Sequence, residues 1–325
     1  MIDIWRKKFI LSDSDRPASM EDIRPTETDY EALDPKTFEA IEAEALFRTI
    51  DQTKTEIGRL ALYRSIARPA QDAQVLQQKQ IALREIESNP ALYNALTHYV
   101  GKITSGEKSL KHLLYGEFSG GLATDEPSSR SDKLEFGGYG YRQYQDGTQF
   151  AVDLVEKAEA LPRPQSAYLR TLLDAIHNFG QARMFALMQG PVYSMGGKFK
   201  SKKEKTSFDL YSRFRPSLFK LMPMLLSLAA GYGLLFFMEI LMPALGTSYL
   251  FYGILALTLP VFPIVLLAIG VSDRDSIIYP LRKQFRESPE LAKAIEALGL
   301  LDELLSFVRY GQACTGGKVL PEILD

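Results

Sequence analysis

The sequence predicts an all-α protein in which a two-helix membrane hairpin interrupts a polar helical body. Two observations lead to this prediction. Apolar residues recur at helical spacing through most of the chain, as they do along the buried face of a helix. In contrast, residues 221–271 are apolar almost throughout and carry a single charged side chain, that of Glu239. We call residues 221–271 the apolar block.

The composition excludes several classes of protein. The 325 residues are 46% hydrophobic, which is enough for a folded core. The net charge of -2 predicts no general attraction to nucleic acid. The single cysteine, Cys314, excludes an internal disulfide and is compatible with a reducing compartment.

The first part of the chain is expected to be an extended lead-in, residues 1–34, where Asp, Ser, Pro and Glu are frequent. Residues 35–218 are then expected to form a helical region. Its first helix should begin at Pro35 with Asp34 as the capping residue. A later helix should end at Pro69, because proline cannot continue a helix.

Glycine and polar residues concentrate in residues 116–147, which predicts a flexible surface loop within the helical region. The phosphate-binding pattern G-x-x-x-x-G-K-[ST] does not occur there. Helical spacing returns between Gln149 and Met188, so the loop is expected to interrupt the region without ending it.

A cluster of basic residues precedes the apolar block. Its members are Lys198, Lys200, Lys202, Lys203, Lys205, Arg213, Arg215 and Lys220. Such a cluster serves as a nucleic-acid contact, as a solvated surface, or as the cytoplasmic flank of a membrane span. Its position favours the third role, because Lys and Arg are enriched on the cytoplasmic side of membrane helices.

The transmembrane hairpin is expected to occupy residues 219–272. Residues 221–246 and 248–271 each exceed the length of about 20 residues that a helix needs to cross a bilayer. Basic residues flank both outer ends and are absent from the connecting turn, so both termini are expected on the cytoplasmic side of the inner membrane. Glu239 falls near the far end of the first span, where it is expected to act as an interfacial anchor.

The remaining residues, 273–325, are expected to form a returning amphipathic helix and a C-terminal tail. Pro289 marks the start of this helix, and apolar residues continue at helical spacing to Val308.

The sequence of residues 50–60, IDQTKTEIGRL, resembles the opening of the core and lever domain of the MutS family of DNA mismatch repair proteins. In that family an Asp-x-Thr-x-Thr-x-x-Gly segment begins a helix and a proline closes it. The matching residues here are Asp51, Thr53, Thr55, Gly58, Arg59 and Pro69. Residues 33–47 are similar to a divergent branch of the family that carries membrane segments. The resemblance covers residues 33–90 and continues in the same order over 149–325.

The resemblance implies a helical core with long lever arms, in which the membrane hairpin replaces the DNA clamp of the relatives. MutS proteins hydrolyse ATP in a C-terminal P-loop domain. The sequences that begin at Gly196 and Gly316 lack the P-loop spacing and its Ser or Thr. We therefore expect no cofactor in this chain, with ATP and Mg²⁺ bound only if an ATPase domain is supplied elsewhere.

These observations together lead us to expect a membrane-anchored MutS-like module that is not catalytic by itself. Its expected partners are the lipid bilayer and either a separate ATPase half or a second copy of the chain. The role implied by the family is ATP-dependent binding of mismatched DNA. His98, His112 and His177 are scattered and lack metal-ligand spacing, so no catalytic or metal-binding residues are predicted.

Three alternatives remain open. A small oligomeric transporter or channel component would use Glu239 on its pathway. A membrane scaffold would have no role on DNA. A DNA-binding protein would use residues 198–205, and at this net charge its binding would be weak and sensitive to salt.

Overall fold

The structure of the chain is a computed structural model. It describes residues 5, 16–27, 33–70, 72–118, 137–206, 210–217, 220, 226, 229–233, 236–237, 240 and 264–314. The chain divides into two compact units. Unit 1 comprises Met1–Gly116, Asp146–Gly190 and Lys283–Asp325, and unit 2 comprises Glu117–Gln145 and Pro191–Arg282.

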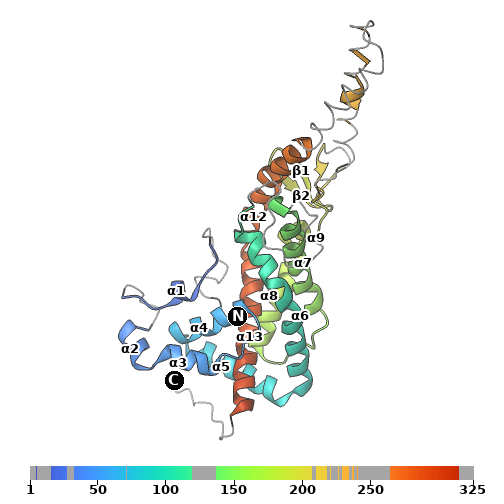
Figure 1. Ribbon diagram of the computed structural model, residues 1–325. Helices are drawn as coiled ribbons and strands as arrows, with labels where there is room; N and C mark the ends of the chain where they lie inside the picture. The colour runs from blue at the N-terminus through green and yellow to red at the C-terminus, as the bar shows by residue number, and fades with distance from the viewer. Residues whose placement is uncertain are drawn as a thin grey trace. The chain divides into compact units, whose positions relative to one another are not determined.

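The regular elements that the structure describes in unit 1 are all helices (Figure 1). Its helices are α1 (Met20–Ile23), α2 (Pro35–Ala40), α3 (Ala43–Ile50), α4 (Glu56–Ala67), α5 (Ala73–Ser88), α6 (Pro90–Tyr115), α8 (Ala167–Gln181), α9 (Arg183–Gln189) and α13 (Pro289–Ala313). Two further helices, α7 (Tyr141–Ala158) and α12 (Tyr279–Arg286), have residues in both units.

Unit 2 contains the 3₁₀ turn η2 (Gly137–Tyr139), the π-helical turn η3 (Arg274–Ile278) and three short strands. The strands are β1 (Tyr193–Met195), β2 (Lys198–Lys200) and β3 (Ser212–Arg213), and they form an antiparallel sheet in the order β2-β1-β3. The prediction of a mainly helical chain is confirmed. The strands were not predicted, because each is too short to show an alternating pattern.

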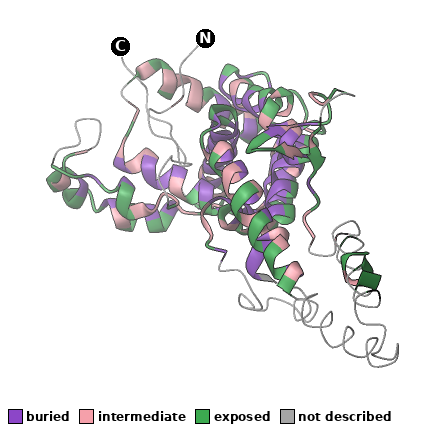
Figure 2. Cartoon of the chain, turned by 90° about the horizontal axis from the view of Figure 1, so that it is seen from above, coloured by how far each residue is buried: buried purple, intermediate pink, exposed green. Residues whose placement is uncertain are grey.

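The long helix α13 is the centre of unit 1. It packs most extensively against α4 and α8, and also contacts α5 and α6. Nearly every residue from Leu291 to Val308 is buried. Figure 2 colours the buried residues of the chain purple. The spacing of its leucines predicts one apolar face, whereas the neighbouring helices cover α13 on several sides.

The ends of several helices follow their local sequence. Asp34 caps α2 by accepting a hydrogen bond from the amide of Thr37 at 3.0 Å, and Ser288 caps α13 ahead of Pro289. Pro69 comes directly after Arg68, the C-cap residue of α4. The predicted starts at Pro35 and Pro289 and the predicted stop at Pro69 are confirmed, because capping depends on residues close in sequence.

The loop predicted at residues 116–147 ends earlier than expected. Helix α7 begins at Tyr141. Tyr139, the last residue of the preceding turn η2, is buried. Tyr144, on the first turns of α7, is buried as well. Residues 119–136 lie outside the described part of the chain.

The hairpin predicted at residues 219–272 falls largely outside the described residues, and so does Glu239. Among the helices that the structure does describe, none combines the length and the hydropathy needed to cross a membrane. The described residues within 221–271 are 226, 229–233, 236–237, 240 and 264–271, and all of these are helical.

Candidate functional site

The segment that carries the family resemblance forms the start of α4. Thr55 is the N-cap residue, and its side-chain oxygen accepts a hydrogen bond from the amide of Gly58 at 2.8 Å. One carboxylate oxygen of Asp51 accepts hydrogen bonds from Thr53, from its amide at 3.2 Å and from its hydroxyl at 2.6 Å. These residues therefore shape the backbone that leads into the helix.

A buried carboxylate on α13 holds this helix start in place. Oδ2 of Asp302 accepts hydrogen bonds from the amides of Lys54 and Thr55 at 2.7 and 2.8 Å, and from the Thr55 hydroxyl at 2.9 Å. Its Oδ1 accepts a hydrogen bond from the guanidinium group of Arg309 at 3.2 Å. Because Asp302 is fully buried, these donors replace water as the groups that stabilise its charge.

A second buried carboxylate, that of Glu107 on α6, accepts hydrogen bonds from the next two amides of α4. Glu107 accepts hydrogen bonds from the amide of Glu56 at 2.8 Å and from that of Ile57 at 2.6 Å. The first amides of a helix have no partner within it, and a negative charge there is favoured by the helix dipole. Burial raises the pKa of Glu107, the two amide hydrogen bonds oppose this rise, and the charges of Glu56 and Asp302 add to it.

The other motif residues also act on structure. A Cβ atom at Gly58 would lie 2.5 Å from Oδ2 of Asp302, so only glycine fits there without a shift. Arg59 forms an ion pair with Asp51 at 3.1 Å, and its guanidinium carbon lies 5.7 Å from the centre of the Phe47 ring. The motif therefore explains how α4 docks on α13.

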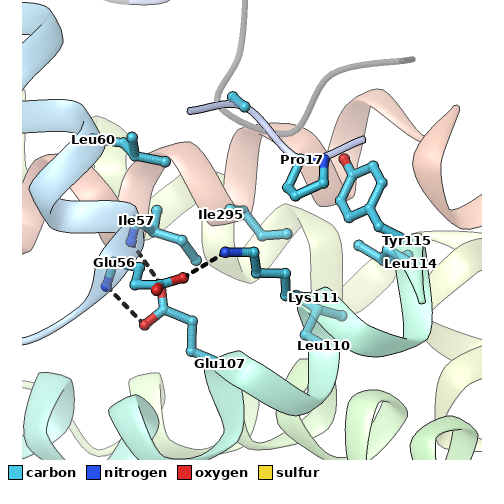
Figure 3. A pocket seen from close by; sticks show the side chains of 11 residues that line it. Pro17, Glu56, Ile57, Leu60, Glu107, Leu110, Lys111, Leu114, Tyr115 and Ile295 are labelled. Atoms are coloured by element: carbon cyan, nitrogen blue, oxygen red, sulfur yellow. Dashed lines mark hydrogen bonds and ion pairs between the residues drawn. The ribbon is translucent and has the colours of Figure 1, made fainter. Parts of the chain in front are cut away.

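A hollow of about 50 Å³ lies beside the start of α4 (Figure 3). A volume of this size holds a few water molecules, since one needs about 10–15 Å³. The residues that line it are Pro17, Ala18, Glu56, Ile57, Leu60, Glu107, Leu110, Lys111, Leu114, Tyr115 and Ile295.

The charged groups in this wall are engaged with one another or with the backbone. Each carboxylate oxygen of Glu107 accepts a hydrogen bond from a backbone amide of α4. Nζ of Lys111 lies 2.9 Å from a carboxylate oxygen of Glu56 (Figure 3). The arrangement stabilises the start of α4.

Within the described ranges, no group of three or more His, Cys, Asp or Glu side chains is placed to hold a metal ion. His98 and His112 lie on α6, and His177 lies on α8, where its Nδ1 is 2.8 Å from the carbonyl oxygen of Leu173. Cys314, which follows α13, is exposed.

The predicted basic cluster lies in unit 2, on and around the three-stranded sheet. Directly paired residues of neighbouring strands project from the same face. The pairing therefore defines one face, which we call the basic face, made of Tyr193, Met195, Lys198, Lys200 and Arg213. The opposite face carries Phe199, which is buried.

Two lysines of the cluster lie over aromatic rings. Nζ of Lys200 is 4.7 Å from the centre of the Tyr211 ring, and Nζ of Lys205 is 4.3 Å from the centre of the Tyr193 ring. These cation–π contacts hold the long side chains at the sheet. The remaining exposed members of the cluster beyond the strands are Lys202, Lys203 and Arg215.

Lys220, the last basic residue of the cluster, links the two ends of the apolar block through an ion pair. Nζ of Lys220 donates a hydrogen bond to Oδ2 of Asp273, and the hydroxyl of Tyr141 donates to the same oxygen at 2.5 Å. The Lys220 and Asp273 side chains are only 20% and 10% exposed. Burial, together with the hydrogen bond to Asp273 and its charge, raises the pKa of Tyr141. We call these three residues the clasp.

Six large apolar side chains among the described residues of the block are well exposed, whereas Leu266 is buried. Their exposed fractions lie between 60% and 69% for Leu226, Tyr232, Phe236, Phe237, Ile240 and Ile264. Contiguous exposed apolar side chains mark surfaces that contact lipid or another protein. Unit 2 therefore contains the basic sheet, the clasp and exposed apolar residues.

The structure brings some predicted residues together and leaves others apart. The motif residues from Asp51 to Arg59 meet at the start of α4 in unit 1, whereas the basic residues belong to unit 2. Sequence reasoning missed Glu107, Asp302, Asp273 and Tyr141. An acidic residue inside an otherwise apolar helical run, as at Asp302, was the available signal for one of them.

A scan against protein-family models, a search of curated proteins and a search of solved structures each find no match for this chain. The function of this chain is therefore inferred from the geometry of its two units and from the sequence resemblance at residues 33–90.

Proposed function

We propose that this chain is a membrane-anchored helical module of the MutS core and lever type, which is not catalytic by itself. In this proposal residues 221–271 form a hairpin in the bilayer, and the helices of unit 1 work on its cytoplasmic side. The observation that carries the proposal is the ion pair between Lys220 and Asp273.

Lys220 and Asp273 stand immediately before and soon after the apolar block, so their contact places its two ends side by side. A segment that crosses a bilayer once leaves its two flanks on opposite sides. A helical hairpin returns to the side from which it started, and its ends meet. The exposed apolar side chains within the block and the basic residues that precede it support a bilayer as the medium around the hairpin.

The helical arrangement of unit 1 supports the lever part of the proposal. The motif at residues 51–59 docks on α13, a helix that follows the apolar block in the chain. The chain therefore leaves the helical core, passes through the block and returns to the core. MutS proteins send lever helices out to a DNA clamp and back in the same order, and here the hairpin stands in place of the clamp.

The ATP-dependent binding of mismatched DNA that characterises the family would then belong to an assembly. The partner that completes it is a P-loop ATPase domain on another chain, or a second copy of this chain that is joined to such a domain. A P-loop ATPase encoded directly beside this chain that copurifies with it would support this arrangement. A purified chain that binds neither a P-loop ATPase nor DNA would leave a membrane scaffold.

Fractionation of cells that express the full chain tests the membrane anchor. The protein is expected to stay with membranes through washes in high salt and alkaline carbonate, and to be released by detergent. Recovery in the supernatant after ultracentrifugation without detergent would contradict the proposal.

The clasp provides a matched control. Because the ends of the block are adjacent, a short Gly-Ser linker in place of residues 221–271 is expected to join Lys220 to Ser272 without strain. This variant should keep the helical signal in circular dichroism and move to the soluble fraction. If it remained with the membranes, the anchor would lie elsewhere in the chain.

A further inference from the structure

We infer that the basic face of the three-stranded sheet binds the headgroups of anionic phospholipids at the base of the apolar block. This inference rests on the proposed function and adds to it a lipid class and the residues that recognise it.

Basic residues far outnumber acidic residues around the sheet. Residues 198–220 contain eight basic and two acidic residues, although the whole chain has a net charge of -2. Anionic lipids give the cytoplasmic leaflet a negative surface potential, and each nearby Lys or Arg strengthens attraction to it about fivefold. Because the chain as a whole has no net positive charge, an anionic partner would bind through this local positive surface.

The register of the strands turns this charge toward one side. Lys198 pairs with Met195, and Lys200 and Arg213 pair with Tyr193 on either side of β1. Met195 is 47% exposed, and Phe199 on the opposite face is 3% exposed. A face that combines cations with an exposed methionine and a tyrosine has the composition of a surface at the boundary between headgroups and acyl chains.

A tight turn holds this face in shape. Gly196 and Gly197, between β1 and β2, have φ values of +55° and +76°. Positive φ at both central residues is the requirement of a type I′ hairpin turn, and glycine meets it without strain. Lys198 is therefore fixed at the end of a short hairpin and is not carried on an irregular loop.

The sheet that carries the basic face is joined to the base of the apolar block through its opposite, buried face. The amide of Phe214, the residue after β3, donates a hydrogen bond to the carbonyl of Val192 at 2.9 Å. Nζ of Lys220 lies 5.7 Å from the centre of the Phe214 ring and reaches Asp273 as well. This connection favours a lipid surface over nucleic acid, because the sheet and the exposed apolar residues of the block belong to the same unit.

The single cysteine of the chain makes a site-specific probe practical. A Cys314→Ser, Met195→Cys variant of the full chain is labelled with an environment-sensitive nitrobenzoxadiazole dye. It is reconstituted into vesicles of phosphatidylcholine, with or without phosphatidylserine. We expect the emission to increase and shift to the blue with the fraction of phosphatidylserine, and high salt to reverse the change. The same dye on Cys314 of the original chain should not respond.

Charge reversal separates the basic face from net charge. Adding Lys198→Glu, Lys200→Glu and Arg213→Glu to the labelled variant should abolish the response to phosphatidylserine. The matched control reverses three exposed lysines of unit 1, Lys36, Lys102 and Lys293, and should keep the response. If the first triple variant loses its helical circular dichroism signal, the single changes Lys198→Glu and Arg213→Glu, both at exposed residues, are measured, and each should weaken the response.

Flotation with pure phosphatidylcholine vesicles reports on the hairpin, and the dye reports on the basic face. Flotation without any dye response to phosphatidylserine would overturn this inference and leave the proposed anchor standing. A dye response without flotation on phosphatidylcholine would uphold the inference and overturn the anchor. A response to duplex DNA and not to phosphatidylserine would show a nucleic-acid contact and overturn the inference.

Discussion

Lys220 and Asp273 form an ion pair across 53 residues of sequence, and the apolar block lies between them. Tyr141 donates a second hydrogen bond to the same carboxylate oxygen. The contact brings together the residues that precede and follow the block.

Removing one charge of the clasp should destabilise unit 2. Asp273→Asn is expected to lower the free energy of unfolding by about 1–3 kcal/mol, because Lys220 would keep its charge in a mostly buried place without a carboxylate. Thermal unfolding in detergent micelles, followed by circular dichroism, measures the loss. The double variant Lys220→Met, Asp273→Asn should lose less than the two single variants together. Strictly additive losses would mean that the ion pair contributes nothing.

The close contact at Gly58 predicts a large effect for the smallest substitution. Gly58→Ala should lower the free energy of unfolding by about 2–4 kcal/mol, because the new methyl group would lie within 2.5 Å of Asp302. Gly101→Ala on α6 is the matched control. No atom lies within 4 Å of its added Cβ, so it should be neutral or stabilise the helix by up to about 1 kcal/mol. Urea unfolding of both variants makes the comparison, and equal effects would contradict the close packing of Gly58 on Asp302.

Glu107 predicts a dependence of stability on pH. Burial raises its pKa in the folded state above the ordinary value of 4.5. Such a carboxyl favours folding while it is protonated, and this contribution is lost as the pH rises from 4.5 through the folded pKa. The free energy of unfolding of the original chain, minus that of Glu107→Gln, should therefore fall as the pH rises through this window. Urea midpoints over a pH series give the difference, and a difference that rises with pH would refute the assignment.

A buried ion pair joins α4 to α13. The guanidinium group of Arg64 contacts the carboxylate of Glu296, and their side chains are 6% and 0% exposed. Arg64→Met should cost about 3–5 kcal/mol of stability, because it leaves a buried carboxylate without its cation. Arg64→Met combined with Glu296→Leu should recover part of that loss. A double variant as unstable as the single one, measured by urea unfolding, would show that packing and not charge sets the cost.

Local features were predictable from the sequence because their causes are local. Asp34 and Pro35 specify a helix start by themselves, and the pair Gly196 and Gly197 permits the turn between β1 and β2. The existence of the strands was not predicted, because hydrogen bonds to β3, a separate segment, complete the sheet. Sequence alone also singled out the motif from Asp51 to Gly58, but not the contacts that make it necessary.

The sequence by itself determined the helical character of the chain, its helix boundaries at prolines and caps, and the concentration of apolar residues between Lys220 and Asp273. Only the tertiary structure decided which groups the buried polar residues form hydrogen bonds with. Asp302 lies 247 positions after Thr55 in the sequence and accepts a hydrogen bond from the Thr55 amide. Glu107 lies 50 positions after Ile57 and accepts a hydrogen bond from the Ile57 amide. Burying a carboxylate requires donors in place of water, and folding alone brings such donors from distant parts of the chain.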